Sequence, residues 1–285
     1  MSEKDRYIPG VPCWVDASEP DPAAAVEFYA GLFGWQLEDR MPADASGSYF
    51  MAELGGGEVG AISSPMGGAP PQAMWNTYVW VESADATAVK VGEVGGAVLA
   101  EPFDVFEAGR MAVCADREGA VFSLWQPKRH RGAQAVNEPG AVVFNDLVTR
   151  DLEAAKEFYG AVFGWGVLAL GDGPGMWVLP GYGEFLESIN PGTLERMAAV
   201  GAPAGFENVV ASVAEPPPGQ SDMPPHWGVT FGVEDADATA AKARELGGTV
   251  LAEPFDAPWV RMTVIADPQG AAFTASKFVP ENKDL

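Results

Sequence analysis

Short apolar runs alternate with helical stretches along the whole chain, which predicts strands joined by helices. Residues 11–15 and 141–148 have the length and apolar character of buried strands. Each run is followed by an aspartate, Asp21 or Asp151, which fits a helix N-cap because a carboxylate accepts the N–H groups that the first helical turn leaves unbonded. Further strands are predicted at residues 49–54, 60–63, 76–81, 97–100, 110–115 and 121–125, and again at 176–180, 208–213, 228–233, 249–252, 261–266 and 271–276.

Glycines mark where the predicted helices end. The first helix of each half stops at Gly34 or Gly164, which suit left-handed caps, and the second helix, 85–94 or 237–246, is closed by a Gly-Gly pair. A strand, a helix and further strands therefore follow one another twice in each half of the chain. This order predicts an α+β fold in which each half is a pair of βαβββ units.

The two halves of the chain repeat each other. The sequence Leu-Ala-Glu-Pro-Phe-Asp at 99–104 returns unchanged at 251–256, and Phe-Tyr…Phe-Gly-Trp at 28–35 returns at 158–165. The copies lie 130 residues apart at the aromatic motif but 152 apart at the other, so the second copy holds about 22 additional residues. We expect them within 184–225, either as a lid or interface element or as a surface excursion.

The repeat predicts two tandem domains, residues 8–126 and 140–279, joined by a linker at 127–139. The linker region has no apolar period and contains a basic cluster at 128–131. A solvated connector is the simpler interpretation of that cluster, and an anion site is the alternative.

Composition excludes several classes of partner. Forty acidic residues against seventeen lysines and arginines give a net charge of −23, which repels nucleic acids and anionic membrane surfaces. The charged first six residues lack the apolar core of a secretory signal, and no apolar run approaches the roughly 18 residues of a membrane span. We therefore expect a cytoplasmic protein. The two cysteines, Cys13 and Cys114, lie in apolar runs and are predicted to be buried rather than catalytic.

Several motifs together resemble one known family. Each copy has an aspartate followed by Phe-Tyr…Phe-Gly-Trp, then a strand, a helix and Gly-Gly, and finally Asp-x-x-Gly-Ala-x-Phe at 116–122 or 267–273. In this order the motifs resemble the vicinal oxygen chelate superfamily of glyoxalases, bleomycin-resistance proteins and extradiol dioxygenases. The resemblance covers about residues 8–278 and is greatest to tandem glyoxalase-like proteins of actinobacteria. It implies that each copy forms a curved mixed sheet from its paired βαβββ units.

The resemblance also implies where metal ligands would lie. Metalloenzymes of the superfamily place His or Gln on the first strand of one unit, His on the first strand of the next, and Glu on a last strand. The equivalent positions of this chain carry side chains that are not usual ligands for a divalent ion: Trp14, Asn76 and Ser123 in the first copy, and Phe144, Gly228 and Thr274 in the second. We therefore expect no bound metal and no cofactor.

Side chains alternate along a strand, so residues two apart share a face with those positions. An aromatic lining with a few polar groups binds flat, apolar ligands by stacking. The candidate ligand-binding residues are accordingly Trp14, Asn76, Tyr78, Trp80, Ser123, Trp125, Phe144, Thr230 and Thr274. In the alternative interpretation these aromatic side chains fill the concavity and leave no pocket.

Three functions stay open at this point. We favour a metal-independent protein that binds an aromatic or apolar small molecule, as resistance or accessory proteins of natural-product metabolism do by sequestration. The alternative is an enzyme, either a lyase or isomerase of the glyoxalase kind or a cofactor-free hydroxylase or cyclase acting on an aromatic metabolite. An interaction protein with vestigial clefts is the third.

If the protein is an enzyme, carboxylates are its candidate catalytic groups. Asp16 and Asp146 share a face with the lost ligand positions, and burial in an apolar concavity would raise the pKa of each toward a range useful for acid–base catalysis. His226 is a secondary candidate, two residues before Gly228. We expect a monomer whose copies form a pseudo-dimer, or a homodimer.

Overall fold

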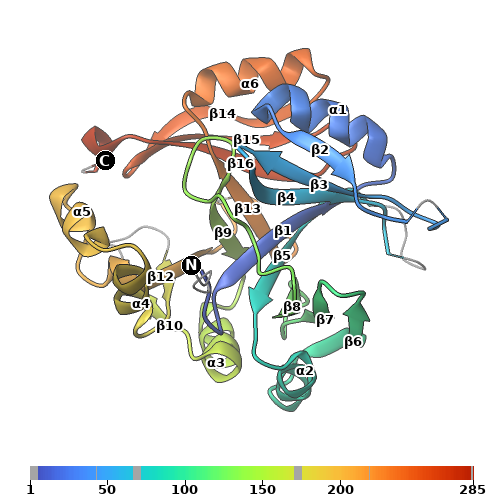
Figure 1. The fold of residues 1–285 in the computed structure, drawn as a ribbon. Coiled ribbons are helices and arrows are strands. Elements are labelled where there is room, and N and C mark those ends of the chain that lie inside the picture. The colour runs from blue at the N-terminus through green and yellow to red at the C-terminus, as the bar shows by residue number, and fades with distance from the viewer. Residues whose placement is uncertain (1–5, 43, 67–71, 170–174, 218, 284) are drawn as a thin grey trace. The chain divides into compact units, whose positions relative to one another are not determined.

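The structure, a computed structural model, describes residues 6–42, 44–66, 72–169, 175–217, 219–283 and 285 (Figure 1). The first copy contains β1 (Pro12–Ser18), α1 (Pro22–Phe33), β2 (Gln36–Asp39), β3 (Tyr49–Leu54), β4 (Gly57–Ser63), β5 (Met74–Trp80), α2 (Ala84–Glu93), β6 (Ala97–Val105), β7 (Gly109–Ala115) and β8 (Val121–Pro127). The second contains β9 (Val142–Val148), α3 (Leu152–Phe163), β10 (Gly166–Leu168), β11 (Gly175–Val178), α4 (Tyr182–Ile189), α5 (Thr193–Ala199), β12 (Val209–Ala214), β13 (His226–Gly232), α6 (Ala236–Glu245), β14 (Thr249–Ala257), β15 (Val260–Ala266) and β16 (Ala272–Phe278). Short 3₁₀ turns occupy Phe206–Asn208 and Pro280–Asn282.

Each copy forms one eight-stranded mixed sheet, which confirms the predicted α+β fold. The strand order is β2-β3-β4-β1-β5-β8-β7-β6 in the first copy and β10-β11-β12-β9-β13-β16-β15-β14 in the second. The pairs β1–β4 and β5–β8 are parallel, whereas β3–β4 and β7–β8 are antiparallel. Each half of a sheet is therefore a βαβββ unit, as the sequence predicts.

The sequence pattern does not predict the edge strands β2 and β10. The sequence of β2, Gln-Leu-Glu-Asp, is mostly exposed, and β10 is only three residues long. β2 offers no apolar run, and the apolar residues of β10 are too few to predict a strand, so each segment is a strand through its pairing with the neighbouring one. β6 also continues to Val105, five residues beyond its predicted end.

The chain divides into two compact units that differ from its sequence copies. Unit 1 comprises Met1–Cys13, Thr77–Gly132 and Asn145–Trp227, and unit 2 comprises Trp14–Asn76, Ala133–Phe144 and Gly228–Leu285. Each unit therefore combines the first half of one copy with the second half of the other. The domain boundaries derived from the repeat stay a prediction.

Aromatic side chains from both copies form the core of each unit. In unit 2, where α1 and α6 lie side by side (Figure 1), the indole N–H of Trp35 donates to the carbonyl of Gly140 at 2.7 Å. The equivalent bond in unit 1 runs from Trp165 to the carbonyl of Gly10 at 2.8 Å. The buried aromatic residues of unit 2 include Phe28, Tyr29, Trp35, Trp75, Phe231 and Phe273.

The predicted caps of the first helices are confirmed. The carboxylates of Asp21 and Asp151 accept from the backbone N–H three residues on, at 3.1 and 2.9 Å. Gly34 and Gly164 end these helices in the left-handed conformation, with φ values of 73° and 77°. Helices α2 and α6 begin one residue before their predicted starts, because Ser83 and Asp235 are the capping side chains.

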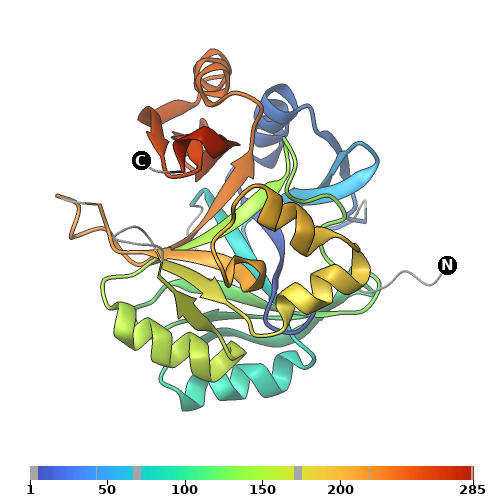
Figure 2. The same ribbon diagram turned by 90° about the vertical axis from the view of Figure 1, so that its left-hand side faces the viewer.

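The additional residues of the second copy include two helices, α4 and α5, which lie next to each other (Figure 2). Residues 190–192 separate the two helices. The carboxylate of Glu187, on α4, accepts from the backbone N–H groups of Gly192 and Leu194 at 2.7 and 3.0 Å and so caps α5. Whether this segment acts as a lid stays a prediction.

Among the residues that the structure describes, no helix is long and apolar enough to cross a membrane. The expectation about the start of the chain rests partly on residues 1–5, which lie outside the described residues.

Replacing Gly248 by alanine tests the packing of unit 2. A Cβ at Gly248 would lie 2.9 Å from both the ring of Phe28 and the carbonyl oxygen of Ala266, which is closer than real Cβ atoms approach. We expect Gly248→Ala to lower the free energy of unfolding by about 1–3 kcal/mol, as overpacking does. Urea denaturation measures the change.

The matched control is Gly92→Ala, in helix α2, where a Cβ would meet no atom within 4 Å. Alanine favours helix over glycine by about 1 kcal/mol, so this variant should be neutral or more stable than the wild type. Equal effects of the two variants would contradict the close approach at Gly248.

Candidate functional site

A buried carboxylate on β1 is the centre of a polar cluster in unit 2. Asp16 is only 3 % exposed. Its Oδ1 accepts a hydrogen bond from Asn76 Nδ2 at 2.9 Å, and its Oδ2 accepts from the hydroxyl of Tyr49 at 3.2 Å. That hydroxyl accepts from Trp14 Nε1 at 2.9 Å. The structure thus brings three predicted site residues together and adds Tyr49; we call these four residues the Asp16 cluster.

The strand order places the members of this cluster. β4 lies between β1 and β3, and Ala61 on β4 is the register partner of both Asp16 and Met51. Because residues two apart on a strand share a face, Tyr49 faces the same side of the sheet as Asp16. The small side chain of Ala61 stands between them. Asn76 comes from β5, the neighbour of β1 on its other side.

The cluster combines a charged acceptor with neutral donors. Burial, together with the charge of Asp16, raises the pKa of Tyr49 well above its usual value of 10. Tyr49 therefore keeps its proton and remains a donor. The Tyr49 hydroxyl and the Asn76 amide both donate to the Asp16 carboxyl group and fix its position. Chemically, the cluster offers a fixed hydrogen-bond acceptor beside an indole ring.

Sequence reasoning missed Tyr49 as a site residue. Tyr49 is the first residue of a predicted strand, but its hydrogen bond to Asp16 crosses the intervening strand β4. Strand order supplies that information, and the hydrophobic pattern alone does not. The available signal was a polar aromatic residue beginning a strand of the same βαβββ unit as Asp16.

The other aromatic candidates of the first copy lie in unit 1. Tyr78 is the register partner of Ser123, and Trp80 that of Trp125, so the four side chains share one face of β5 and β8. All four are buried. The Trp80 ring stacks on Tyr7 with 6.2 Å between centroids, and Trp125 Nε1 donates to a linker carbonyl at 3.0 Å. Within unit 1, these tryptophans therefore pack against the chain's own N-terminal segment and linker.

The second-copy carboxylate has a different partner. Asp146 is half-buried, and its Oδ1 accepts from the hydroxyl of Ser212 at 2.6 Å. Ser212 is its register partner, at the position that Ala61 holds relative to Asp16. Gly228 replaces the amide donor Asn76. The two copies therefore surround equivalent aspartates with different chemistry.

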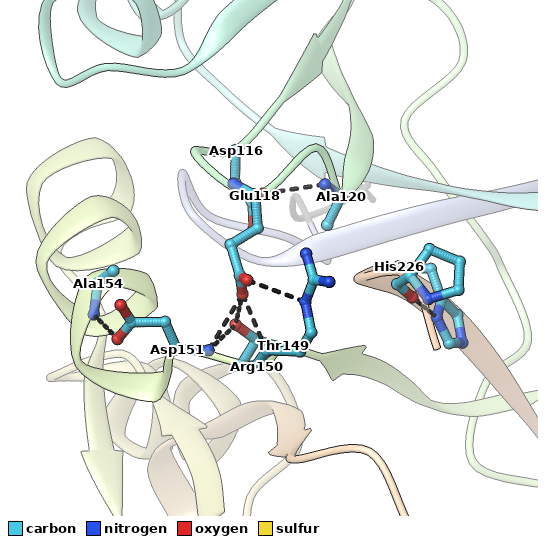
Figure 3. A network of polar contacts seen from close by, with 9 residues as sticks. Asp116, Glu118, Ala120, Thr149, Arg150, Asp151, Ala154 and His226 are labelled. Carbon is cyan, nitrogen blue, oxygen red and sulfur yellow. Dashed lines mark hydrogen bonds and ion pairs between the residues drawn. The ribbon is translucent and has the colours of Figure 1, made fainter. Parts of the chain in front are cut away.

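The remaining candidates are more accessible. In unit 2, Phe144 and Thr274 are half-buried, and Thr230, the register partner of Thr274, is buried. His226 is the exposed first residue of β13, and its Nδ1 lies 2.9 Å from the carbonyl oxygen of Pro224 (Figure 3). The structure thus gives His226 a main-chain contact within its own segment.

The described residues do not include a group of three or more His, Cys, Asp or Glu side chains placed to hold a metal ion. Cys13 and Cys114 are buried, as predicted. Burial raises the pKa of the Cys114 thiol to about 12 and also raises that of Cys13, so both thiols stay protonated at neutral pH.

The chain belongs to the Glyoxalase/Bleomycin resistance protein/Dioxygenase superfamily, whose sequence model matches residues 14–124 and 140–274. The match in two segments confirms the resemblance that the repeated motifs predict.

Two kinds of relative cover nearly the whole chain. A Mycobacterium tuberculosis protein named "Putative glyoxylase CFP32" is 40 % identical over 285 residues, which is 99 % of this chain and 100 % of the relative. The "Anthracycline biosynthesis protein DnrV" of Streptomyces peucetius is 35 % identical over 282 residues, 94 % of each chain.

Solved structures share the fold at low sequence identity. The Mn(II)-bound glyoxalase of Novosphingobium aromaticivorans has a TM-score of 0.58 at 15 % identity, over 94 % of this chain and 82 % of that one. The 2,3-dioxygenase LapB of Pseudomonas sp. KL28 also has a TM-score of 0.58, at 12 % identity, over 95 % of this chain and 93 % of that one. Likeness at these identities shows a common fold.

Removing the Tyr49 hydroxyl tests the Asp16 cluster. Tyr49→Phe withdraws a donor from Asp16 and an acceptor from Trp14, both of which are buried. The Asp16 carboxyl group and the Trp14 N–H would then each stay buried with one hydrogen bond fewer. Because a buried polar group without its partner is costly, we expect the free energy of unfolding to fall by about 1–3 kcal/mol. Urea denaturation at pH 7 is the measurement, and a variant as stable as the wild type would show that the bridging hydroxyl contributes nothing.

Proposed function

We propose that this protein binds a planar aromatic or otherwise apolar small molecule without a metal ion, in a resistance or accessory role in natural-product metabolism. The observation that carries the proposal is the Asp16 cluster. Two of its members, Trp14 and Asn76, occupy strand positions where the family resemblance implies metal ligands. The cluster holds an indole, an amide and a phenol around one carboxylate. These groups can orient an organic molecule by hydrogen bonds and ring contacts.

The accessibility of the cluster supports this role. Tyr49 and Asn76 are half-buried, whereas Trp14 and Asp16 are buried. Tyr49 and Asn76 are therefore the two members of the cluster with some exposed surface. The carboxylate beneath them accepts hydrogen bonds, which favours ligands that carry hydroxyl or amino groups on an apolar ring system.

The names of the relatives agree with a ligand of this class. Two Streptomyces relatives, 35 % identical to this chain, are named as proteins of anthracycline biosynthesis. Anthracyclines are built on fused planar rings that carry hydroxyl groups. The proposed ligand is accordingly a polycyclic aromatic compound of comparable chemistry. A cytoplasmic location and a monomeric or homodimeric state remain predictions.

A second candidate function is acid–base catalysis on such a compound, and the burial of Asp16 favours it. A carboxyl group that two neutral donors hold in position can act as a general base, because it can accept a proton from a bound compound at a fixed place. Tyr49 would then hold the carboxylate in position. The reaction would be that of a lyase or isomerase, or that of a cofactor-free hydroxylase or cyclase, which are the alternatives that the sequence leaves open.

Binding is tested by tryptophan fluorescence titration with anthracycline, quinone and flavin compounds. A ring contact with Trp14 is worth about 0.5–1.5 kcal/mol beyond area burial, so Trp14→Ala should raise the Kd roughly two- to tenfold. Because Trp14 is buried, Trp14→Phe is measured beside it to separate loss of fold from loss of contact. Asn76→Ala should also weaken the binding of ligands that carry hydroxyl groups.

The control is Trp259→Ala, which removes a half-buried tryptophan that stacks on Phe278 outside the cluster. Its Kd should equal that of the wild type. Dialysis against EDTA should leave every Kd unchanged. The binding proposal is wrong if none of the compounds quenches fluorescence, and its metal independence is wrong if EDTA abolishes binding and a divalent ion restores it.

The catalytic alternative is tested by product formation. The wild type is incubated with compounds that bind, and products are sought by liquid chromatography and mass spectrometry. If Asp16 is the base, Asp16→Asn should lower turnover at least about a hundredfold, the scale of general-base catalysis, which is far more than it weakens binding of the same compounds. Binding without any turnover by the wild type would favour sequestration.

A further inference from the structure

A second buried acid, Glu19, lies outside the Asp16 cluster. Glu19 directly follows β1 and is 0 % exposed, and neither of its carboxyl oxygens accepts a hydrogen bond from a donor group of the described residues. A buried carboxylate without any donor is costly, because its charge loses water and gains nothing in return. An orphaned acid of this kind needs a proton or a partner.

The carboxyl group that interacts with Glu19 is another buried acid, Asp267, which is 2 % exposed and lies in the turn between β15 and β16. Asp267 is rich in donors: its Oδ1 accepts from the backbone N–H groups of Gln269, Gly270 and Ala271 at 2.8 to 3.0 Å, and its Oδ2 accepts from Tyr29 at 3.2 Å. Both carboxyl oxygens of Asp267 therefore already accept hydrogen bonds. A protonated Glu19 would add one further donor, whereas an ionised Glu19 would add a second negative charge.

Unit 1 contains the same framework with the acid in another place. The position of Glu19 is taken there by Thr149, and the position of Gln269 by Glu118. Figure 3 shows the Glu118 carboxylate receiving hydrogen bonds from the Thr149 hydroxyl at 2.5 Å and from the backbone N–H groups of Arg150 and Asp151 at 2.9 and 3.1 Å. In unit 1 the acid is therefore fully supplied with donors.

In unit 2, Gln269 makes the corresponding contacts without a charge. Its amide accepts from the N–H of Asp21 at 2.7 Å and donates to the carbonyl of Asp21 at 2.8 Å. The turn therefore needs no acid, and Glu19 is not required to hold it. What distinguishes unit 2 is a carboxyl group buried against a second carboxyl group.

We propose that Glu19 and Asp267 share one buried proton, which keeps the core of unit 2 closed and is released to solvent in alkali. In the closed state the Glu19 O–H donates to the Asp267 carboxylate. Loss of that proton leaves two carboxylates facing each other, and the core must open to hydrate them. The groups that bear on Glu19 are Asp267 from the turn and Tyr29 from α1; no lysine or arginine of the described residues contributes.

The direction of the pH effect follows from the proton count. Burial, reinforced by Asp267, raises the pKa of Glu19 from its ordinary 4.5 to about 9. The folded chain therefore binds one more proton than the unfolded chain between these values. The contribution of Glu19 to stability is fully present below pH 4.5 and is lost as the pH rises toward 9, with a change of up to tenfold in the unfolding constant for each pH unit.

The pair also lies close to the candidate site along β5. The Tyr29 hydroxyl that donates to Asp267 accepts from Trp75 Nε1 at 3.1 Å. The next residue of that strand is Asn76, the amide donor of Asp16. Opening of the pair would therefore disturb the strand that carries part of the Asp16 cluster.

The test is Glu19→Gln, which copies the shape of the protonated acid without its charge. Urea denaturation of the full chain is followed at pH 6, 7 and 8. We expect the wild-type unfolding constant to rise relative to that of Glu19→Gln by up to about tenfold per pH unit, or about a hundredfold from pH 6 to pH 8. Glu19→Thr, which reproduces the residue of unit 1, should abolish the same dependence.

The matched control is Glu118→Gln in unit 1. Burial alone would raise the pKa of Glu118, but the hydrogen bonds from Thr149, Arg150 and Asp151 outweigh it and hold the pKa below its ordinary value. The contribution of Glu118 is therefore present at neutral pH and lost in acid, the opposite sign. Glu118→Gln should leave the difference between pH 6 and pH 8 unchanged.

A measurement on the wild type keeps the test independent of folding. Glutamate side-chain carboxyl carbons are followed by ¹³C NMR, and the signal missing from Glu19→Gln is assigned to Glu19. That signal should report a protonated carboxyl at pH 7. The proposal is overturned if the signal titrates near pH 4.5, or if the ratio of the two unfolding constants is the same at pH 6 and pH 8.

Discussion

One tyrosine hydroxyl in each compact unit joins the two copies of the sequence. In unit 2 the hydroxyl of Tyr29 accepts from Trp75 and donates to Asp267 of the other copy, and in unit 1 Tyr159 accepts from Trp227 and donates to Asp116. Since a buried polar chain is costly unless each member is satisfied, these bonds specify which halves pack together. The second glycines of the Gly-Gly pairs serve the same packing, because side chains at Gly96 and Gly248 would collide with phenylalanines of the other copy.

The two copies differ at residues that take no part in this shared framework. Asp16 and Asp146 occupy equivalent places on equivalent strands, yet one meets a phenol and an amide and the other a serine hydroxyl. Similarly, Glu19 replaces a threonine, and Glu118 replaces a glutamine. Repetition therefore accounts for the fold, whereas the non-equivalent residues are where the two halves acquire separate chemistry.

The fold was predictable because its signals are local and appear twice. The caps at Asp21 and Asp151, the left-handed glycines and the apolar runs each act within a few residues. The sequence does not predict that each unit combines halves of both copies. Both copies carry the aspartate that can bond the tyrosine, so the repeat alone does not show which of the two is the partner of Tyr29. The Asp16 cluster was predictable in part: strand alternation links Trp14 to Asp16, but Tyr49 arrives across an intervening strand. Glu19 gave no sequence signal, since an acid at a strand end is ordinarily exposed.

The buried acids show that surroundings, rather than residue type, set protonation. The buried carboxyl group of Asp16 accepts hydrogen bonds from Asn76 and Tyr49, and that of Asp267 accepts from four donors. Glu19 is buried as deeply but has no donor, so it is stable as the neutral acid. A chain of net charge −23 gains nothing electrostatically from a further buried anion. A proton on Glu19 therefore neutralises the buried carboxylate without bringing another ion into the core.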